Sequence, residues 1–85
     1  MPYYVYVLLC VDGSFYTGYA RDVDARVRQH MSGNGARYTK LHRPKKLVHT
    51  EEFGMRSEAM KRERKIKRLS HDEKRRLCRL RKRGC

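Results

Sequence analysis

The chain has 85 residues, enough for one domain and too few for two independent cores. Hydrophobic residues make up 39% of it and charged residues 36%, so we expect a small core beneath a highly charged surface. No apolar run approaches the roughly 20 residues of a membrane span, and no apolar segment of the signal-peptide kind opens the chain. Both features argue against a membrane-spanning or secreted protein.

Positive charge is concentrated in the last third of the chain. Lys and Arg number 22 against 9 Asp and Glu, a formal net charge of +13, and residues 61–85 hold 13 of the cations and 3 of the acids. Such an excess attracts polyanions by long-range attraction and counterion release, so nucleic acid is the favoured partner. An acidic membrane surface fits less well, because the segment lacks an aromatic, Leu-rich face. The alternative is that the basic segment is a solvated tail that binds no partner.

A β-hairpin is expected first in chain order. Residues 3–9 (YYVYVLL) are β-branched and aromatic, and their apolar character on both faces predicts a central strand. Asp12-Gly13 predicts a turn into a second, antiparallel strand over residues 15–20 (FYTGYA). Gly18 interrupts that strand, which is typical of a bulge or of a close approach by another backbone or a ligand.

A helix should follow, capped by Asp22 and running to about Met31. Val23, Val27 and Met31 recur at i, i+4 and i+8 and form its apolar stripe. Gly33, at the start of a Gly-Asn-Gly sequence, ends it.

The next segment is expected to be irregular and then extended. A polar, basic loop covers residues 33–45, where Pro44 excludes regular structure. Residues 46–53 (KLVHTEEF) alternate in part and predict a third strand, whose neighbour in the sheet stays open. Ser57 is expected to cap a second helix that runs to about Leu69.

A third helix is expected at the end of the chain. Ser70 and Glu73 form an S-x-x-E capping box, with Leu77 and Leu80 as the apolar positions. The order β-β-α-β-α-α predicts an α+β fold, with a small three-stranded, antiparallel-type sheet flanked by helices. We expect a single domain with these parts: the whole chain 1–85, a core of about 3–69 and a basic C-terminal helix of about 70–83.

The cysteines predict a reducing compartment. Cys10, Cys78 and Cys85 are odd in number and have no metal-type spacing, so we expect free thiols and a cytoplasmic protein. Cys10 lies in an apolar stretch and is expected in the core, and Cys85 is a terminal free thiol.

One carboxylate falls on an apolar helix face. Glu63 lies four residues after Ala59 and three before Ile66, so it shares their side of the second helix. A carboxylate there is costly unless it is paired or binds a cation. An ion pair with an arginine is one explanation, and a ligand for a hard divalent cation is the other.

Other polar groups are candidates for the same neighbourhood. Arg26 and His30 lie four residues apart on the first helix, flanking its apolar stripe; alone, they read as ordinary solvent-facing residues. Tyr6 and Tyr16 lie on the predicted strands, where aromatic residues are by default core. A buried phenol normally needs a hydrogen-bond partner, so phenols close to these groups would form a polar cluster.

At these residues the chain resembles the GIY-YIG nuclease family. Residues 4–6 (YVY) match the first signature and residues 16–18 (YTG) the second, and Arg26, His30 and Glu63 match the arginine, histidine and acidic residue of the family. The likeness spans about residues 3–69. It is strongest to small stand-alone bacterial members and to the nuclease domain of structure-selective Slx-type endonucleases. The tyrosine and threonine in place of Gly and Ile are variations common in that small subgroup.

The resemblance implies a hydrolytic mechanism. Glu63 would hold one Mg²⁺ or Mn²⁺ against the phosphate and the leaving 3′ oxygen. Arg26 would bind the scissile phosphate, Tyr6 or Tyr16 would position or deprotonate the attacking water, and His30 would relay a proton or orient a tyrosine. The metal should be held weakly and keep many waters, because one carboxylate gives few protein ligands.

Two functions are therefore weighed. One is a metal-dependent endonuclease acting on DNA, branched or flapped structures included, with a protein partner as one source of specificity. The other is a non-catalytic nucleic-acid-binding module that keeps the scaffold. In both, basic residues spread along the chain are expected to contact phosphates without reading sequence: Arg21, Arg37, Lys40, Lys61, Arg64, Lys67, Arg75 and Arg79.

Overall fold

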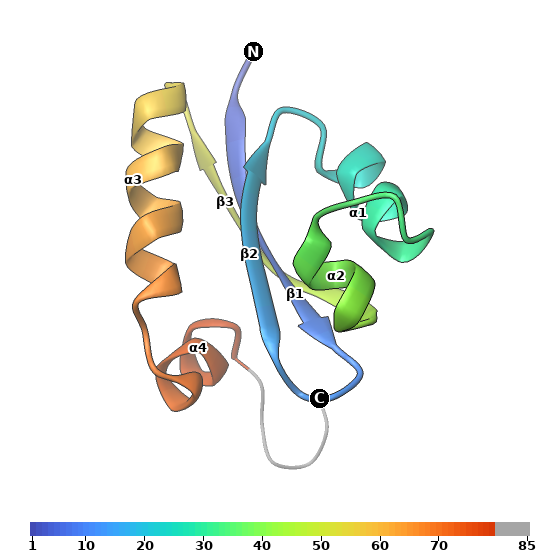
Figure 1. Ribbon diagram of the computed structural model, residues 1–85. Helices are drawn as coiled ribbons and strands as arrows, with labels where there is room; N and C mark the ends of the chain where they lie inside the picture. The colour runs from blue at the N-terminus through green and yellow to red at the C-terminus, as the bar shows by residue number, and fades with distance from the viewer. Residues whose placement is uncertain (80–85) are drawn as a thin grey trace.

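A three-stranded antiparallel sheet forms the centre of the protein (Figure 1). The computed structural model describes residues 1–79. The strands follow the order β2-β1-β3, so the first strand is central, as its sequence predicts, and pairs antiparallel with both neighbours. The α+β class and the order of the predicted elements are confirmed. The elements are β1 (Tyr3–Cys10), β2 (Phe15–Ala20), α1 (Val23–Met31), α2 (Arg37–Leu41), β3 (Pro44–Phe53), α3 (Arg56–Lys67) and α4 (His71–Leu77).

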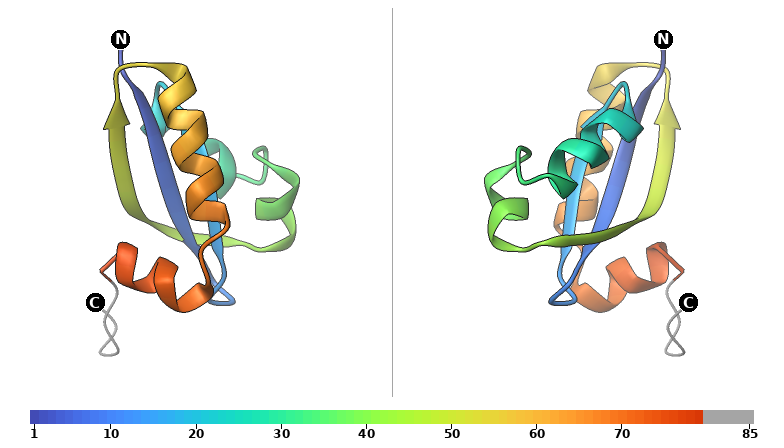
Figure 2. Two further views of the ribbon diagram at one scale, coloured as in Figure 1. Left: turned by 90° about the vertical axis from the view of Figure 1, so that its left-hand side faces the viewer. Right: turned by 90° about the vertical axis from the view of Figure 1, so that its right-hand side faces the viewer.

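Helices cover the two faces of the sheet, α3 on one side and α1 with α2 on the other (Figures 1 and 2). On the α3 face, Ala59 and Ile66 pack in one buried cluster with Val5 and Val7. The α1 face has its own cluster around Tyr6 and Leu8, against which Val23 and Val27 pack. Burial on both faces explains the almost uninterrupted apolar sequence of β1. None of the helices in the described residues is long and apolar enough to cross a bilayer.

The hairpin register places Gly18 directly opposite Tyr6. A Cβ atom at Gly18 would lie 2.6 Å from the hydroxyl oxygen of Tyr6, so only glycine leaves room for this ring. The expected bulge, or approach by a backbone or a ligand, is not what Gly18 accommodates: the group that comes close is the side chain of Tyr6. At the turn, Gly13 has a φ of +87°, a conformation that glycine adopts without strain.

Several predicted boundaries are wrong. The segment 33–45, expected to be a loop, contains α2, and Pro44 is the first residue of β3 rather than a breaker. Proline is tolerated there because β3 is an edge strand and Pro44 is its first residue. Ser57 does not cap α3: only Gly54 and Met55 separate it from β3, so the helix begins at Arg56.

The C-terminal helix is shorter than expected. The capping box of Ser70 and Glu73 is confirmed, but α4 ends at Leu77, with Cys78 buried and Arg79 in the left-handed region at a φ of 55°. The rest of the predicted helix, with Leu80 and Cys85, lies outside the described residues. The imidazole of His71 bonds to the carbonyl oxygen of Gly13 at 2.8 Å, which docks α4 on the hairpin turn.

The hydroxyl of Thr17 is a local defect in the packing between β2 and α3. The residue is 3% exposed, and within the described part of the chain its Oγ1 has no hydrogen-bond partner. We expect Thr17→Val to raise the free energy of unfolding by about 1 kcal/mol, because it removes an unsatisfied buried oxygen. Urea unfolding measures this as a higher midpoint at an unchanged m value. The same change at exposed Thr50 is the control, and a lower midpoint for Thr17→Val would contradict the explanation.

Candidate active site

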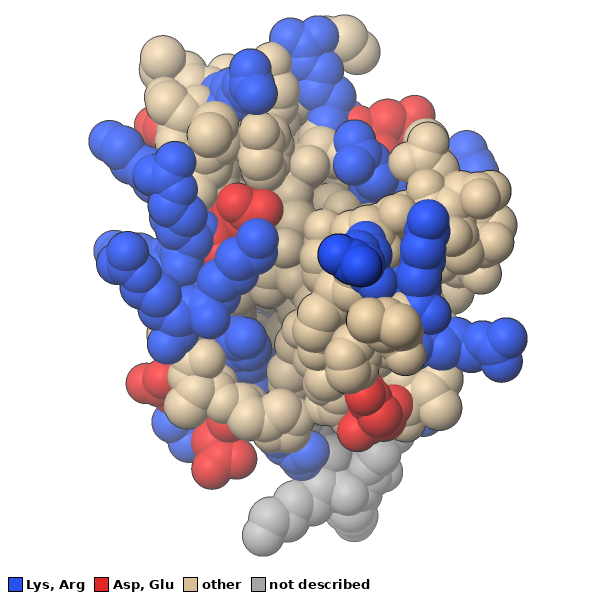
Figure 3. All heavy atoms as spheres, viewed as in Figure 1, with Lys and Arg blue, Asp and Glu red and all other residues tan. Residues whose placement is uncertain are grey.

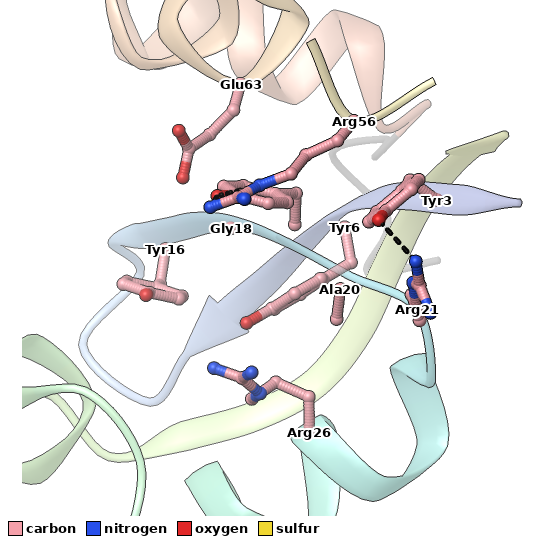
Figure 4. A pocket seen from close by; sticks show the side chains of 10 residues that line it. Tyr3, Tyr6, Tyr16, Gly18, Ala20, Arg21, Arg26, Arg56 and Glu63 are labelled. Carbon is pink, nitrogen blue, oxygen red and sulfur yellow. Dashed lines mark hydrogen bonds between the residues drawn. The ribbon is translucent and has the colours of Figure 1, made fainter. Parts of the chain in front are cut away.

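A pocket of about 420 Å³ lies along β2, the edge strand on the opposite side of the sheet from β3 (Figure 4). Within residues 1–79 no strand pairs with the outer side of β2, so helices from both faces of the sheet reach the same opening. Glu63 enters from α3 and Arg26 from α1, with Tyr6 and Tyr16 between them. The lining residues are Tyr3, Tyr6, Tyr16, Gly18, Tyr19, Ala20, Arg21, Arg26, Arg56 and Glu63.

The negative charge of Glu63, which faces this pocket, is poorly compensated by neighbouring cations. Its side chain is 17% exposed. Among the described residues its salt-bridge partner is Lys67 of the same helix, whose Nζ lies 3.5 Å from the Glu63 Oε2. Glu51 shows the contrast, because Arg62 donates two hydrogen bonds to it at 2.7 and 3.0 Å and lowers the pKa of that carboxyl. The arginine pair weighed for Glu63 is therefore not found in the described residues, and its carboxylate oxygens are open to a cation in the pocket.

Tyr6 and His30 form a buried pair. The Tyr6 oxygen lies 2.9 Å from Nε2 of His30, and both residues are 1% exposed. Burial, with a contribution from nearby Tyr16, raises the pKa of Tyr6 well above its ordinary value. Burial and then the charge of Arg26 lower the pKa of His30. Both groups are therefore neutral at pH 7, and the reading of His30 as an ordinary solvent-facing residue is wrong.

Arg26 brings positive charge to the pocket from the side opposite α3. Its backbone belongs to the first turn of α1, which Asp22 caps by accepting a hydrogen bond from the Ala25 amide at 3.0 Å. The cap confirms the predicted helix start and fixes where the guanidinium projects. In Figure 4 it points into the pocket near the Tyr6 hydroxyl.

Two further arginines at the pocket are held by tyrosine hydroxyls. Arg21 donates to the Tyr3 oxygen at 2.7 Å and lies over the Tyr3 ring, and Arg56 donates to the Tyr19 oxygen at 3.3 and 3.4 Å. Arg21 was expected to contact nucleic acid, whereas sequence reasoning missed Arg56. The expected cap at Ser57 places Arg56 before the helix, so no signal in the sequence marked it as a pocket residue.

The remaining predicted phosphate contacts do not line the pocket. Lys61, Arg64 and Lys67 are exposed on α3, and Arg37 and Lys40 are exposed on α2. Figure 3 shows Lys and Arg side chains on both sides of the hollow between α3 and the α1–α2 side. On α4 and just beyond it, Arg75 is half-buried and Arg79 is exposed.

Comparison with known proteins places the chain in a family. Residues 2–76 match the family model of the GIY-YIG catalytic domain. This chain belongs to the GIY-YIG family.

The curated relatives match this chain over most of their length. A UPF0213 protein of Staphylococcus saprophyticus is 49% identical over 75 residues, covering 88% of this chain and 92% of the relative. A UPF0213 protein of Staphylococcus aureus is 52% identical over the same shares of the two chains. These names specify no activity or substrate.

Two solved structures support the GIY-YIG fold. The solution structure of a UPF0213 protein from Bacillus halodurans is 49% identical and gives a TM-score of 0.59, covering 94% of this chain and 85% of that one. A solution structure from E. faecalis is 44% identical with a TM-score of 0.63, covering 93% and 84%.

Proposed function

We propose that this GIY-YIG protein is a metal-dependent endonuclease that hydrolyses phosphodiester bonds in DNA. The observation that carries the proposal is the convergence of Tyr6, Arg26 and Glu63 on one pocket, from three separate segments of the chain. Hydrolysis of a phosphodiester needs a cation that binds the phosphate, an acceptor for the proton of the attacking water, and neutralisation of the charge that develops. Arg26 can supply the first, Tyr6 the second and a cation held by Glu63 the third.

The donor set at the pocket fits a hard divalent cation held by a single carboxylate. In the described residues no group of three or more His, Cys, Asp or Glu side chains gathers to form a metal cage. Glu63 would hold Mg²⁺ or Mn²⁺, with water and substrate phosphate as the other ligands, which is how Mg²⁺ is commonly bound. When bound, such an ion neutralises phosphate charge and stabilises the leaving oxygen.

The protein's own groups divide the remaining work. Arg26 binds the scissile phosphate with its planar fork. Tyr6 takes a proton from the attacking water while its own phenolic proton passes to Nε2 of His30, so no free phenolate forms and His30 ends the step as imidazolium. Both groups begin the step neutral, because burial raises the pKa of Tyr6 and lowers the pKa of His30. Tyr16, whose ring lies 6.3 Å from that of Tyr6, helps to position the water.

The basic surface supplies affinity that does not depend on sequence. The net charge of +13 and the cations on both sides of the pocket suit a polyanion lying across β2. We also propose that the protein acts in the cytoplasm, where the buried thiols of Cys10 and Cys78 stay free, and that a protein partner adds target choice.

We expect Arg56→Gln to weaken binding to duplex DNA and to lower the slope of log affinity against log salt by about 1, because one phosphate contact is lost. Fluorescence anisotropy across a salt series measures this. Arg28→Gln is the matched control, since Arg28 is also exposed but does not line the pocket. An unchanged slope for Arg56→Gln would place the DNA elsewhere.

Cleavage of a substrate panel tests the proposed function. Purified protein is incubated with labelled linear, flapped and branched DNA, and with matched RNA, in the presence of Mg²⁺, Mn²⁺ or EDTA. We expect metal-dependent cuts in DNA that EDTA abolishes. Salt-sensitive binding without cleavage of any member would instead support the non-catalytic nucleic-acid-binding module.

A further inference from the structure

The short helix α2 brings a threonine behind the imidazole of His30. Thr39 is 2% exposed, and its Oγ1 lies 2.7 Å from Nδ1 of His30, on the side of the ring opposite Tyr6. The same oxygen donates to the carbonyl oxygen of Ala36 at 2.9 Å. Gly35 closes the arrangement, because a Cβ at this position would collide with Nδ1 of His30. Residues 35–39 thus wrap one side of the ring.

The number of available protons decides which group donates in each of these hydrogen bonds. A threonine hydroxyl has one proton, and the Ala36 carbonyl oxygen can only accept it. With that proton given to Ala36, Thr39 must accept from His30, so Nδ1 carries the hydrogen. Nε2 of the neutral ring is then a bare acceptor, and Tyr6 donates to it.

The other tautomer fits the same positions poorly. With the hydrogen on Nε2, Nδ1 would need a donor, and Thr39 would have to turn its only proton toward the ring. Two acceptor oxygens, of Thr39 and Ala36, would then face each other at 2.9 Å with no proton between them.

We propose that Thr39 is a positioning residue that fixes His30 in the Nδ1-protonated tautomer and so keeps Nε2 ready to receive the Tyr6 proton. The inference rests on the proposed function for its role in catalysis, but the tautomer is a property of the folded protein alone. Thr39 acts through His30 and does not reach the substrate pocket.

Nitrogen NMR of ¹⁵N-histidine-labelled protein tests the tautomer directly, well above the ordinary imidazole pKa of about 6.5. In the parent we expect His30 to show a protonated Nδ1 and a bare Nε2. Thr39→Val removes the acceptor and should move His30 toward the Nε2-protonated form, whereas Thr39→Ser should keep the parent pattern. A protonated Nε2 in the parent, or a Thr39→Val spectrum identical to that of the parent, overturns the proposal.

Cleavage kinetics test the consequence separately. We expect Thr39→Val to lower kcat by about 10-fold or more with little change in KM, and Thr39→Ser to recover it, within the range typical of proton-transfer catalysis. A threonine that only supported packing would not give this combined pattern of tautomer, kcat and rescue. If the parent cuts no substrate, the proposed function fails while the NMR result still decides the role of Thr39.

Discussion

Glu63→Gln is expected to lower metal-dependent cleavage by at least about 100-fold, the scale on which removal of one charge-stabilising group acts in other active sites. The amide keeps the size of the side chain and removes the anionic oxygens on which Mg²⁺ or Mn²⁺ depends. Single-turnover cleavage of the best DNA substrate, at several metal concentrations, measures the effect.

DNA affinity and a control variant distinguish this loss of cleavage from a general defect of the folded protein. The carboxylate lies among DNA-facing cations, so its neutralisation should leave affinity for DNA unchanged or higher. Glu58→Gln is the matched control, because Glu58 is exposed on the same helix and does not line the pocket. Equal loss in both variants, or full activity of Glu63→Gln, would remove Glu63 from the catalytic step.

Tyr6→Phe is expected to reduce kcat by about 100-fold or more with a small change in KM, because the attacking water loses its proton acceptor. The variant should still fold, since only the hydroxyl is removed. It leaves the buried Nε2 of His30 without a partner, which costs about 1–3 kcal/mol of unfolding free energy. Rapid-quench cleavage and urea unfolding measure the two effects.

Tyr4→Phe provides the comparison for the loss of a phenol from the same strand. Tyr4 is half-buried, two residues from Tyr6, and does not line the pocket. We expect parent-like kinetics from it. If Tyr6→Phe also has parent-like kinetics, Tyr16 is the proton acceptor instead. If kcat falls in both Tyr4→Phe and Tyr6→Phe, the effect is structural.

Regular patterns in the sequence were sufficient for most of the fold. The apolar run of β1 predicted a strand buried on both faces, and the spacing of Ala59 and Ile66 placed Glu63 on the inner side of α3. Asp22 and the Ser70–Glu73 box marked helix starts through local hydrogen bonds. Each of these signals acts within one element, so short-range reasoning captures it.

The missed features depend on contacts between elements. The five residues of α2 are too few to show a helical period, and its position depends on contacts made through Thr39 and Gly35. Arg56 became visible as a pocket residue only when α3 was placed beside Tyr19. The sequence leaves the neighbour of β3 open, and the structure pairs it with β1, in agreement with the central position predicted for β1.

The outer edge of β2, which pairs with no other strand in the described part of the chain, affects how copies of this protein behave toward each other. An uncovered strand edge is a template for another strand, and natural proteins commonly block it with charged side chains. Arg21, Arg26 and Arg56 stand around the pocket along this edge. Mutual repulsion among these guanidinium groups discourages two molecules from joining edge to edge, so the residues proposed to attract DNA also oppose aggregation.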